Sequence, residues 1–206
     1  MVLEYLPGGE LIRLLRRDSE GSSCIAEPES KYYLAEILLA LETLHDANII
    51  YRDLKPQNIL IDSQGHAKLI DFGFSKRMKN IRSGRTYTNC GTPGYLAPEV
   101  MLDVVGYNYK ADLWSFGTLM CEMLGGFIPF GGSEAANPRA IMERCHSGHL
   151  SLPKNLSPAA RELVKELLNP DPMQRADISQ IKQHHFFKNM DWQALKRRQV
   201  APPISR

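Results

Sequence analysis

The sequence predicts a mainly α-helical domain that carries one small β-hairpin. Apolar residues recur at three- and four-residue spacing in several stretches, as they do on the buried face of a helix. Two short apolar segments flank a polar turn, which is the pattern of a hairpin. Residues 73–110 show little periodicity and are rich in Gly, Ser, Thr, Asn and Pro. A loop of this length within a compact domain is usually functional or disordered.

The first part of the chain is expected to hold a strand and two helices. The first elements are a strand over residues 1–6, a turn over 7–9, a short helix over 10–17 and a loop over 18–27. Pro28 suits the first turn of a longer helix. That helix continues to about His45, because apolar residues recur along it at helical spacing. These residues are Leu34, Ile37, Leu38, Leu41 and Leu44.

The hairpin and two further helices follow. The two apolar segments of the hairpin and its polar turn are residues 59–61, 67–70 and 62–65. A helix that is apolar on most sides, and therefore buried, is expected around residues 113–124. Ser157 and Pro158 predict the start of another helix, with serine as the N-cap and proline in the first turn. Pro170 ends that helix.

The composition argues against a membrane protein and against binding to nucleic acid through bulk charge. The 206 residues suit one domain or a domain and a half, and 25 basic and 23 acidic side chains leave a net charge of +2. No apolar run approaches the ~18 residues that span a bilayer. The first residues lack the basic segment and apolar core of a secretory leader. We therefore expect a cytoplasmic protein with no nucleic-acid or membrane partner.

The cysteines and the adjacent histidines are not expected to bind metal. The four cysteines contain no CxxC pair, so they predict reduced thiols rather than a zinc site. Cys90 is expected to be a packed loop residue rather than a reactive thiol. His184 and His185 are neighbours, and neighbouring residues do not share a helix face. We therefore expect a surface or capping pair. The basic run at residues 196–198 is expected to be a solvated tail.

The polar and charged residues that could carry out catalysis lie around the hairpin. Transfer of a phosphoryl group to a hydroxyl needs a carboxylate that orients the hydroxyl, oxygen ligands for magnesium and a cation near the phosphoryl group. Asp53, Lys55 and Asn58 precede the hairpin, and Asp71 follows it. Because the hairpin brings its two ends together, we expect Asn58 and Asp71 to reach one metal cluster. The order of these parts agrees with the general scheme of a protein kinase.

Several motifs in one order carry a family resemblance. They are Tyr51 through Asn58, Asp71-Phe72-Gly73, Thr86 through Glu99, Asp112 through Gly117, and Phe186 through Trp192 followed by Pro202-Pro203. On these motifs the chain resembles the eukaryotic protein kinases, and most of all the cyclic-nucleotide-dependent kinases and their relatives in the AGC group. Tyr51 before Arg-Asp is typical of that group. The resemblance extends from Met1 to about Pro203.

The resemblance implies a partial kinase. Residues 1–187 are expected to be the hinge and the large, mainly helical lobe of the kinase domain, and residues 188–206 the start of an AGC-type C-terminal tail. A complete kinase also has a β-rich small lobe before the hinge. No G-x-G-x-x-G segment occurs in the chain, and no V-A-I-K-like segment precedes the catalytic loop. We therefore expect that lobe to be absent and the chain alone to be inactive.

The resemblance implies roles for the residues around the hairpin, with ATP and Mg²⁺ as cofactors. Asp53 would be the catalytic base, and Lys55 would lie beside the transferred phosphate. The Asp-Leu-Lys-Pro form of this loop is typical of serine/threonine kinases. Asn58 and Asp71 would hold Mg²⁺. Thr92 would hydrogen-bond near Asp53 and Lys55 and help to fix the substrate hydroxyl.

Further residues would regulate or support the site. Thr88 occupies the position of activation-loop phosphorylation by an upstream kinase, and a phosphate there would bring about −1.5 to −2 charge. In this lobe, the cations that could pair with that phosphate are Arg52 and Lys76. Two structural expectations also follow. One is an ion pair between Glu99 and Arg175, and the other is support of the catalytic-loop backbone by Asp112.

The resemblance also implies residues that bind nucleotide and substrate. Leu3 would be the gatekeeper, Glu4 and Leu6 the hinge, and Leu60 the floor under adenine. Glu10 would contact ribose and a substrate arginine. The other substrate-binding positions are Glu122, Pro93 and Leu96. They imply protein substrates with Ser or Thr near basic residues. Three residues depart from the usual pattern of specificity, namely Gln57, Asn89 and Gly94.

Three hypotheses stay open for the chain. It is a fragment of an active kinase, or a natural short form that binds substrates or regulators without catalysis. The third hypothesis is a lobe that regains activity by pairing with a separately encoded small lobe.

Overall fold

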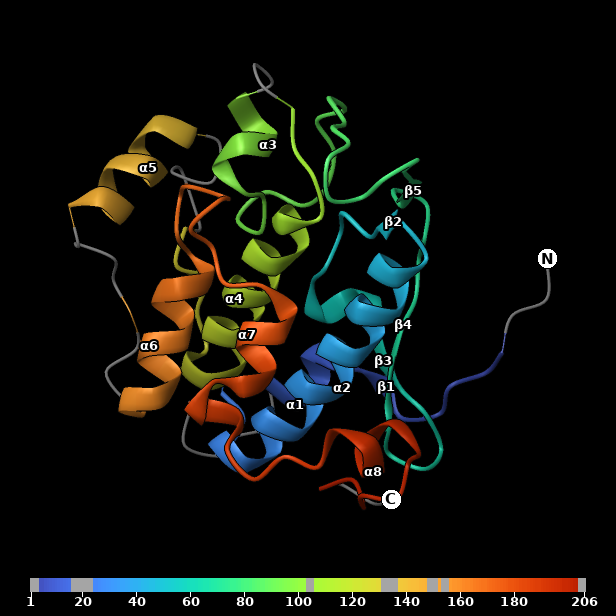
Figure 1. The fold of residues 1–206 in the computed structure, drawn as a ribbon. Helices are drawn as coiled ribbons and strands as arrows, with labels where there is room; N and C mark the ends of the chain where they lie inside the picture. Colours follow the sequence, from blue (N-terminus) through green and yellow to red (C-terminus); the bar gives the residue numbers. More distant parts are fainter. Residues whose placement is uncertain are drawn as a thin grey trace.

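The protein is described from a computed structural model. The structure describes residues 4–15, 24–102, 106–130, 137–147, 152 and 156–203. Leu3 and the first half of the expected first strand, residues 1–3, lie outside these residues. Glu4 to Leu6 form no strand, so that expectation is wrong where it can be examined. The expected turn is present at Pro7 and Gly8. In Figure 1 the blue stretch before this turn extends away from the helical body.

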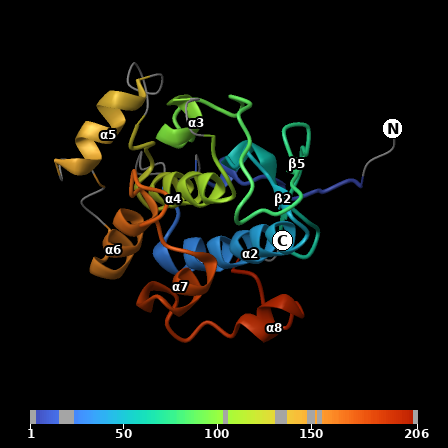
Figure 2. The ribbon, with the colours of Figure 1, turned by 45° about the horizontal axis from the view of Figure 1, so that its top comes forward.

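Two long helices form the centre of the fold, as the sequence predicts. Helix α2 spans Glu27–Asp46 and packs against α4, which spans Lys110–Gly125. The two lie side by side in Figures 1 and 2. Every residue of α4 from Ala111 to Cys121 is buried. The indole of Trp114 stacks on Phe130 at 5.3 Å between ring centroids. The buried, apolar character expected of this helix is confirmed.

Helix α6, which spans Pro158–Leu167, packs closely on α4. A Cβ atom at Gly117 of α4 would stand 2.7 Å from the Cβ of Leu167, so a glycine is needed at this crossing. The predicted cap is present, because the Ser157 hydroxyl accepts a hydrogen bond from the Ala160 amide at 3.1 Å. Pro158 stands in the first turn, and the helix ends before Pro170. The prediction for this helix is therefore confirmed.

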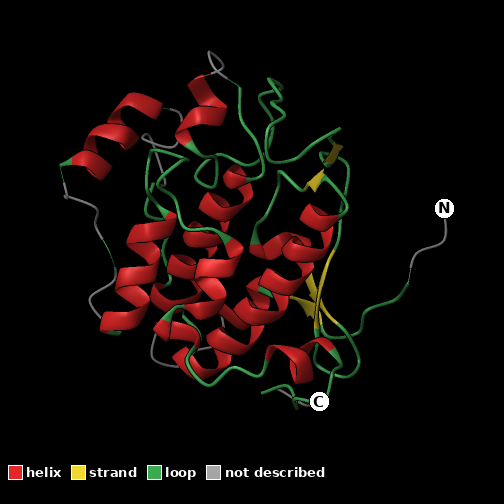
Figure 3. Ribbon diagram, viewed as in Figure 1, coloured by secondary structure: helices red, strands yellow, loops and turns green. Residues whose placement is uncertain are grey.

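The strands form two small antiparallel sheets (Figure 3). The first has the order β1-β3-β4, with β1 at Gly9–Glu10, β3 at Ile59–Ile61 and β4 at Ala67–Leu69. The predicted hairpin is β3-β4, paired Ile59 to Leu69 and Ile61 to Ala67. The second sheet pairs β2, Ile49–Ile50, with β5, Lys76–Arg77.

The structure corrects two other expectations. The short helix expected over residues 10–17 is α1, Ile12–Leu15, within the described residues. Glu10 is not helical because it pairs with Leu60 in the sheet. The stretch 73–110 is not free of elements, since it contains β5, α3 at Pro98–Leu102 and the first residue of α4.

Several short helices complete the described fold. They are α5 (Pro138–His146), α7 (Ile178–Gln183), α8 (Trp192–Lys196) and the 3₁₀ turns η1 (Pro56–Asn58) and η3 (His185–Phe187). Figure 2 shows α8 on the side of α2 opposite α4. The Nδ1 atom of His184 caps η3 by accepting a hydrogen bond from the Phe186 amide at 3.1 Å. The expectation of a capping pair is thus confirmed for His184.

No helix in the described part of the chain has the length and apolar character needed to cross a bilayer. Cys90 and Cys121 are free thiols.

Candidate active site

Asp53 lies at the centre of a compact polar cluster. Its side chain is buried, and its Oδ1 atom accepts a hydrogen bond from the Thr92 hydroxyl at 2.6 Å. Its Oδ2 atom lies 2.8 Å from both the Lys55 ammonium and the Asn58 amide nitrogen. Lys55 also donates to the Thr92 hydroxyl at 2.7 Å. The structure therefore joins four of the expected catalytic residues in one hydrogen-bonded group.

The electrostatics of this group keep Asp53 ionised. Burial by itself raises the pKa of the Asp53 carboxyl, because it penalises the charged form. The hydrogen bonds from Lys55, Thr92 and Asn58 favour the carboxylate and together outweigh that effect. The pKa of Asp53 therefore lies below its ordinary value. At neutral pH this carboxylate is therefore an acceptor held between Lys55, Thr92 and Asn58.

Asp112 holds the backbone that carries Asp53. This residue comes from the first turn of α4 and is fully buried. Its Oδ2 accepts a hydrogen bond from the Tyr51 amide at 2.9 Å, and its Oδ1 accepts one from the Arg52 amide at 2.8 Å. Arg52 has a φ of 74°, a left-handed conformation that is costly for a side chain of this size. The two bonds to Asp112 hold the loop in that conformation.

Asn58 and Asp71 stand at the two ends of the hairpin. The Ile70 amide donates to the Asn58 carbonyl at 2.9 Å, which brings the chain before Asp71 back to Asn58. The amide nitrogen of Asn58 is committed to Asp53, so its oxygen is the atom that remains for a cation. Asp71 is exposed, and its Oδ1 accepts from the Gly73 amide at 3.0 Å. An amide oxygen and a carboxylate are the donors that suit Mg²⁺.

Arg52 and Lys76 both border the segment that carries Thr88. Thr88 is exposed, and its carbonyl accepts a hydrogen bond from the Tyr107 hydroxyl at 2.7 Å. Arg52 donates to the same hydroxyl at 3.2 Å. Lys76 donates to the Thr86 hydroxyl at 3.0 Å. Lys76 therefore contacts this segment directly, and Arg52 is connected to it through Tyr107.

Glu99 and Arg175 form a buried, bidentate ion pair. The two guanidinium nitrogens of Arg175 donate to the two carboxylate oxygens at 2.6 and 3.0 Å. Arg175 also donates to the Lys110 carbonyl at 2.7 Å, and its guanidinium lies 5.1 Å from the centre of the Trp114 ring. This pair connects α3, where the long loop ends, to the segment before α7.

The residues expected around the nucleotide gather on the first sheet. Glu10 of β1 stands opposite Leu60 of β3, and Leu60 stands opposite Lys68 of β4. Lys68 forms an ion pair with the exposed Glu4 at 2.6 Å. Leu6 is half-buried, and its carbonyl accepts from the Gly9 amide at 3.4 Å. Leu3, the expected gatekeeper, lies outside the described residues.

The expected substrate-binding residues come from several elements. Glu122 lies on α4 and accepts a short hydrogen bond from the Tyr95 hydroxyl. Burial raises the pKa of Glu122, and the bond from Tyr95 opposes that rise. Pro93 is exposed and Leu96 is half-buried in the loop between Thr92 and α3. Glu10 lies in β1, so the structure places it on a different element from Glu122.

The sequence reasoning missed two residues that support the site. Tyr107 bridges Arg52 and Thr88, and burial raises its pKa to about 12, so its hydroxyl stays protonated. His45, at the end of α2, places Nε2 2.8 Å from Asp112 Oδ2. Both contacts join residues more than fifty positions apart, so no local pattern could reveal them. The role of Asp112 is implied only by the family resemblance.

Comparisons with known proteins agree with this geometry. The protein kinase domain family matches residues 1–187. The chain is 44% identical over 209 aligned residues to serine/threonine-protein kinase SCH9 of Candida albicans, which covers 99% of the chain and 26% of that protein. It is 42% identical to human cAMP-dependent protein kinase catalytic subunit PRKX, covering 99% of the chain and 55% of that protein. It is also 42% identical to cAMP-dependent protein kinase type 3 of Saccharomyces cerevisiae, covering 98% of the chain and 49% of that protein. The chain thus spans about half or less of these relatives' length.

Proposed function

Because the chain belongs to the protein kinase family and resembles its AGC-type serine/threonine members, we propose that it serves to transfer the γ-phosphate of ATP to Ser or Thr hydroxyls of protein substrates. The observation that carries the proposal is the group formed by Asp53, Lys55 and Thr92. It combines an ionised carboxylate, a cation and a hydroxyl within hydrogen-bonding distance of one another.

Each member of this group has a distinct task. Asp53 accepts a hydrogen bond from the substrate hydroxyl and takes its proton as the oxygen attacks. Lys55 lies beside the carboxylate and supplies positive charge where the phosphoryl group moves. The Thr92 hydroxyl fixes the orientation of both side chains. Asn58 and Asp71 would hold Mg²⁺, which neutralises the charge of the phosphates when it is bound.

We infer the nucleotide and substrate contacts from the same elements. Glu4, Leu6 and Leu60 would bind the adenine side of ATP at the first sheet. Glu10 and Glu122 would select substrates with basic residues near the phosphoacceptor, because carboxylates pair with arginine through charge-assisted hydrogen bonds. Pro93 and Leu96 would line the pocket beside the phosphoacceptor. A cytoplasmic location would give access to such proteins.

Phosphorylation of Thr88 by an upstream kinase would regulate the site. The Thr88 side chain is exposed, and Arg52 and Lys76 border its segment. A phosphate at this position would pair with these cations. Since Arg52 directly precedes Asp53, the pairing would act on the catalytic loop itself. We further propose that residues 188–206 begin an AGC-type tail after the kinase domain.

The second candidate function is a non-catalytic module that binds kinase substrates or regulators. The observation in its favour is that Glu10 and Glu122, the carboxylates proposed to hold a basic substrate, lie on β1 and α4, apart from the loop that carries Asp53. The two functions differ in a measurable way, since a binding module holds a basic Ser/Thr peptide without transferring phosphate to it.

The deciding experiment measures Mg-ATP binding and phosphorylation of a basic Ser/Thr peptide by the purified chain. Asp53→Asn and Asp71→Asn serve as the inactive controls, and Asp46→Asn, an exposed aspartate at the end of α2, is the matched control. Transfer by the wild type and by Asp46→Asn, but not by the other two, supports the kinase. Peptide binding without transfer supports the binding module. Equal transfer by all four proteins contradicts the roles of Asp53 and Asp71.

A further inference from the structure

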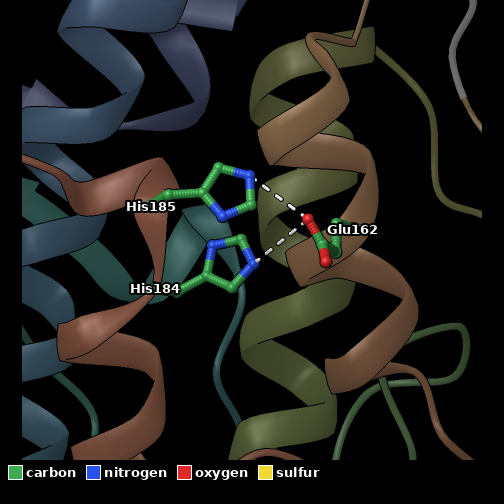
Figure 4. A group of neighbouring side chains, drawn as sticks. All are labelled: Glu162, His184 and His185. Atoms are coloured by element: carbon green, nitrogen blue, oxygen red, sulfur yellow. Dashed lines mark ion pairs between the residues drawn. The ribbon is translucent and has the colours of Figure 1, made fainter.

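Glu162, His184 and His185 form a cluster apart from the kinase motifs (Figure 4). Glu162 lies on α6, and the two histidines follow α7. One potential ligand atom from each residue lies within 4.8 Å of the others. The Glu162 Oε2 atom is 3.2 Å from His185 Nε2 and 3.9 Å from His184 Nε2. Figure 4 shows both imidazole rings directed at this carboxylate.

The backbone explains how two neighbouring residues come to face one carboxylate. Helix α7 ends at Gln183, and His184 has extended angles of φ −63° and ψ 142°. The rule that neighbours do not share a helix face therefore does not apply to this pair. Their rings stack at 4.3 Å between centroids with an angle of 24° between the planes. The sequence argument against this pair assumed that both histidines lie on one helix, whereas α7 ends before them.

We propose that Glu162, His184 and His185 bind a divalent transition-metal ion such as Zn²⁺. Imidazole nitrogens and a carboxylate oxygen are common zinc ligands. Ligand atoms held about 2.1 Å from a tetrahedral ion stand about 3.4 Å apart. The observed separations of 3.2 and 3.9 Å between the Glu162 oxygen and the two imidazole nitrogens lie on either side of that value. A fourth position would be left for water.

The Nε2 atom of His184 is buried without a hydrogen-bond partner among the described residues. The whole side chain is 8% exposed. Buried polar atoms are normally paired, and an ion at the cluster would supply the missing interaction. Glu162 and His185 are each more than half exposed, which leaves an open path for the ion. The ion would tie α6 to His184 and to the first residue of η3.

The cap on η3 gives metal binding a specific signature. Because His184 Nδ1 accepts from the Phe186 amide, the neutral ring carries its proton on Nε2. Binding through Nε2 requires that proton to leave, and the neutral ring then carries a proton on Nδ1. No net proton is gained or lost, but the hydrogen bond from Phe186 is broken. Metal binding therefore switches the tautomer of His184 and releases the Phe186 amide.

The test titrates the 206-residue chain with Zn²⁺ by calorimetry and with Co²⁺ by visible absorption. We expect one ion at the cluster, with the absorption of tetrahedral cobalt. Glu162→Gln and His185→Ala should each weaken zinc binding by at least about tenfold. His184→Asn should do the same while keeping an acceptor for the η3 cap. Glu143→Gln, an exposed carboxylate on α5, is the matched control.

A second measurement separates this cluster from the proposed kinase site. Asp71→Asn removes an expected Mg²⁺ ligand and should leave zinc binding to the cluster unchanged. ¹⁵N NMR of the histidine rings should show His184 moving from the Nε2-H to the Nδ1-H tautomer as zinc is added. Absence of zinc binding, equal affinity in the cluster variants, or an unchanged His184 tautomer with zinc bound overturns the proposal. None of these readouts depends on kinase activity.

Discussion

Arg52 donates a hydrogen bond to the hydroxyl of Tyr107 at 3.2 Å. The same hydroxyl donates to the Thr88 carbonyl, so one tyrosine joins the proposed catalytic loop to the segment with the proposed phosphorylation site. The two loops are therefore connected through the side chain of Tyr107. Removing this contact is a way to measure how strongly they are coupled.

Tyr107→Phe should loosen this connection without disturbing the packing of the ring. We expect a loss of about 1 kcal/mol in the free energy of unfolding, the usual net value of a hydrogen bond. Amide exchange should become faster in residues 86–90. Urea denaturation and hydrogen exchange measure the two effects. Tyr87→Phe, which alters an exposed ring on the same loop, should change neither; similar effects in both variants would argue against a special role for Tyr107.

Asp112→Asn should destabilise the catalytic loop more strongly. An amide nitrogen in place of one carboxylate oxygen would face a backbone N–H, so a charge-assisted bond worth about 1.5–3 kcal/mol is lost. The left-handed backbone of Arg52 would lose its support. Thermal unfolding reports the change, with Asp171→Asn as the exposed control. Equal melting temperatures for the wild type and Asp112→Asn would contradict the anchoring role.

Glu99→Gln should cost about 3–5 kcal/mol, because it leaves the buried guanidinium of Arg175 without a counter-charge. The partly exposed pair between Glu42 and Lys182 offers the comparison. Glu42→Gln should cost at most about 1 kcal/mol, as for a surface ion pair. Chemical denaturation of both variants gives the two values. Costs of similar size would show that burial of the Glu99 pair does not govern its contribution.

The Asp53 carboxyl should make stability depend on acid. Its pKa in the folded chain lies below the unfolded value, so the folded state favours the carboxylate. The resulting stabilisation is fully present above the unfolded pKa of about 3.9 and is lost as the pH falls through the folded pKa. The stability difference between the wild type and Asp53→Asn should therefore be constant above about pH 5 and shrink in more acidic solution. A difference that does not vary between neutral pH and pH 3 would contradict the depressed pKa.

Thr88→Ala should lower peptide phosphorylation if Thr88 carries phosphate in the active protein. The lost phosphate would remove about −1.5 to −2 charge that Arg52 and Lys76 can pair with. Mass spectrometry of the wild type establishes whether the phosphate is present, and a kinase assay gives the activity. Ser83→Ala, at another exposed position of the loop, is the control. Full activity of Thr88→Ala beside a phosphorylated wild type would exclude this form of regulation.

The sequence predicted the elements whose signals are local. Helices α2, α4 and α6 have long apolar periodicity, and α6 also has its serine cap. The hairpin could be predicted because polar turn residues separate two apolar segments. Helices α3, α7 and α8 have five or six residues each, too few to establish a period. Their places depend on long-range contacts such as the ion pair between Glu99 and Arg175.

The same distinction explains what was found and missed in the site. Four candidate residues could be predicted because their side chains suit phosphoryl transfer and all lie next to one hairpin. They are Asp53, Lys55, Asn58 and Asp71. Thr92 and Asp112 became candidates only through family resemblance, because they lie 39 and 60 positions from the residues they contact. Tyr107 and His45 belong to no motif that the sequence displays. The convergence of His184 and His185 on Glu162 depends on where α7 ends, and helix ends are the least certain part of a prediction.

At the close crossing of α4 and α6, the side chain of residue 117 must be no larger than the hydrogen atom of glycine. Leu167 lies where a side chain at residue 117 would begin, so alanine there would push α6 away from α4. Since α6 also carries Glu162, that movement would change the reach of its carboxylate toward the two histidines. The size of residue 117 thus determines the distance between Glu162 and the two histidines, although residue 117 contacts none of them.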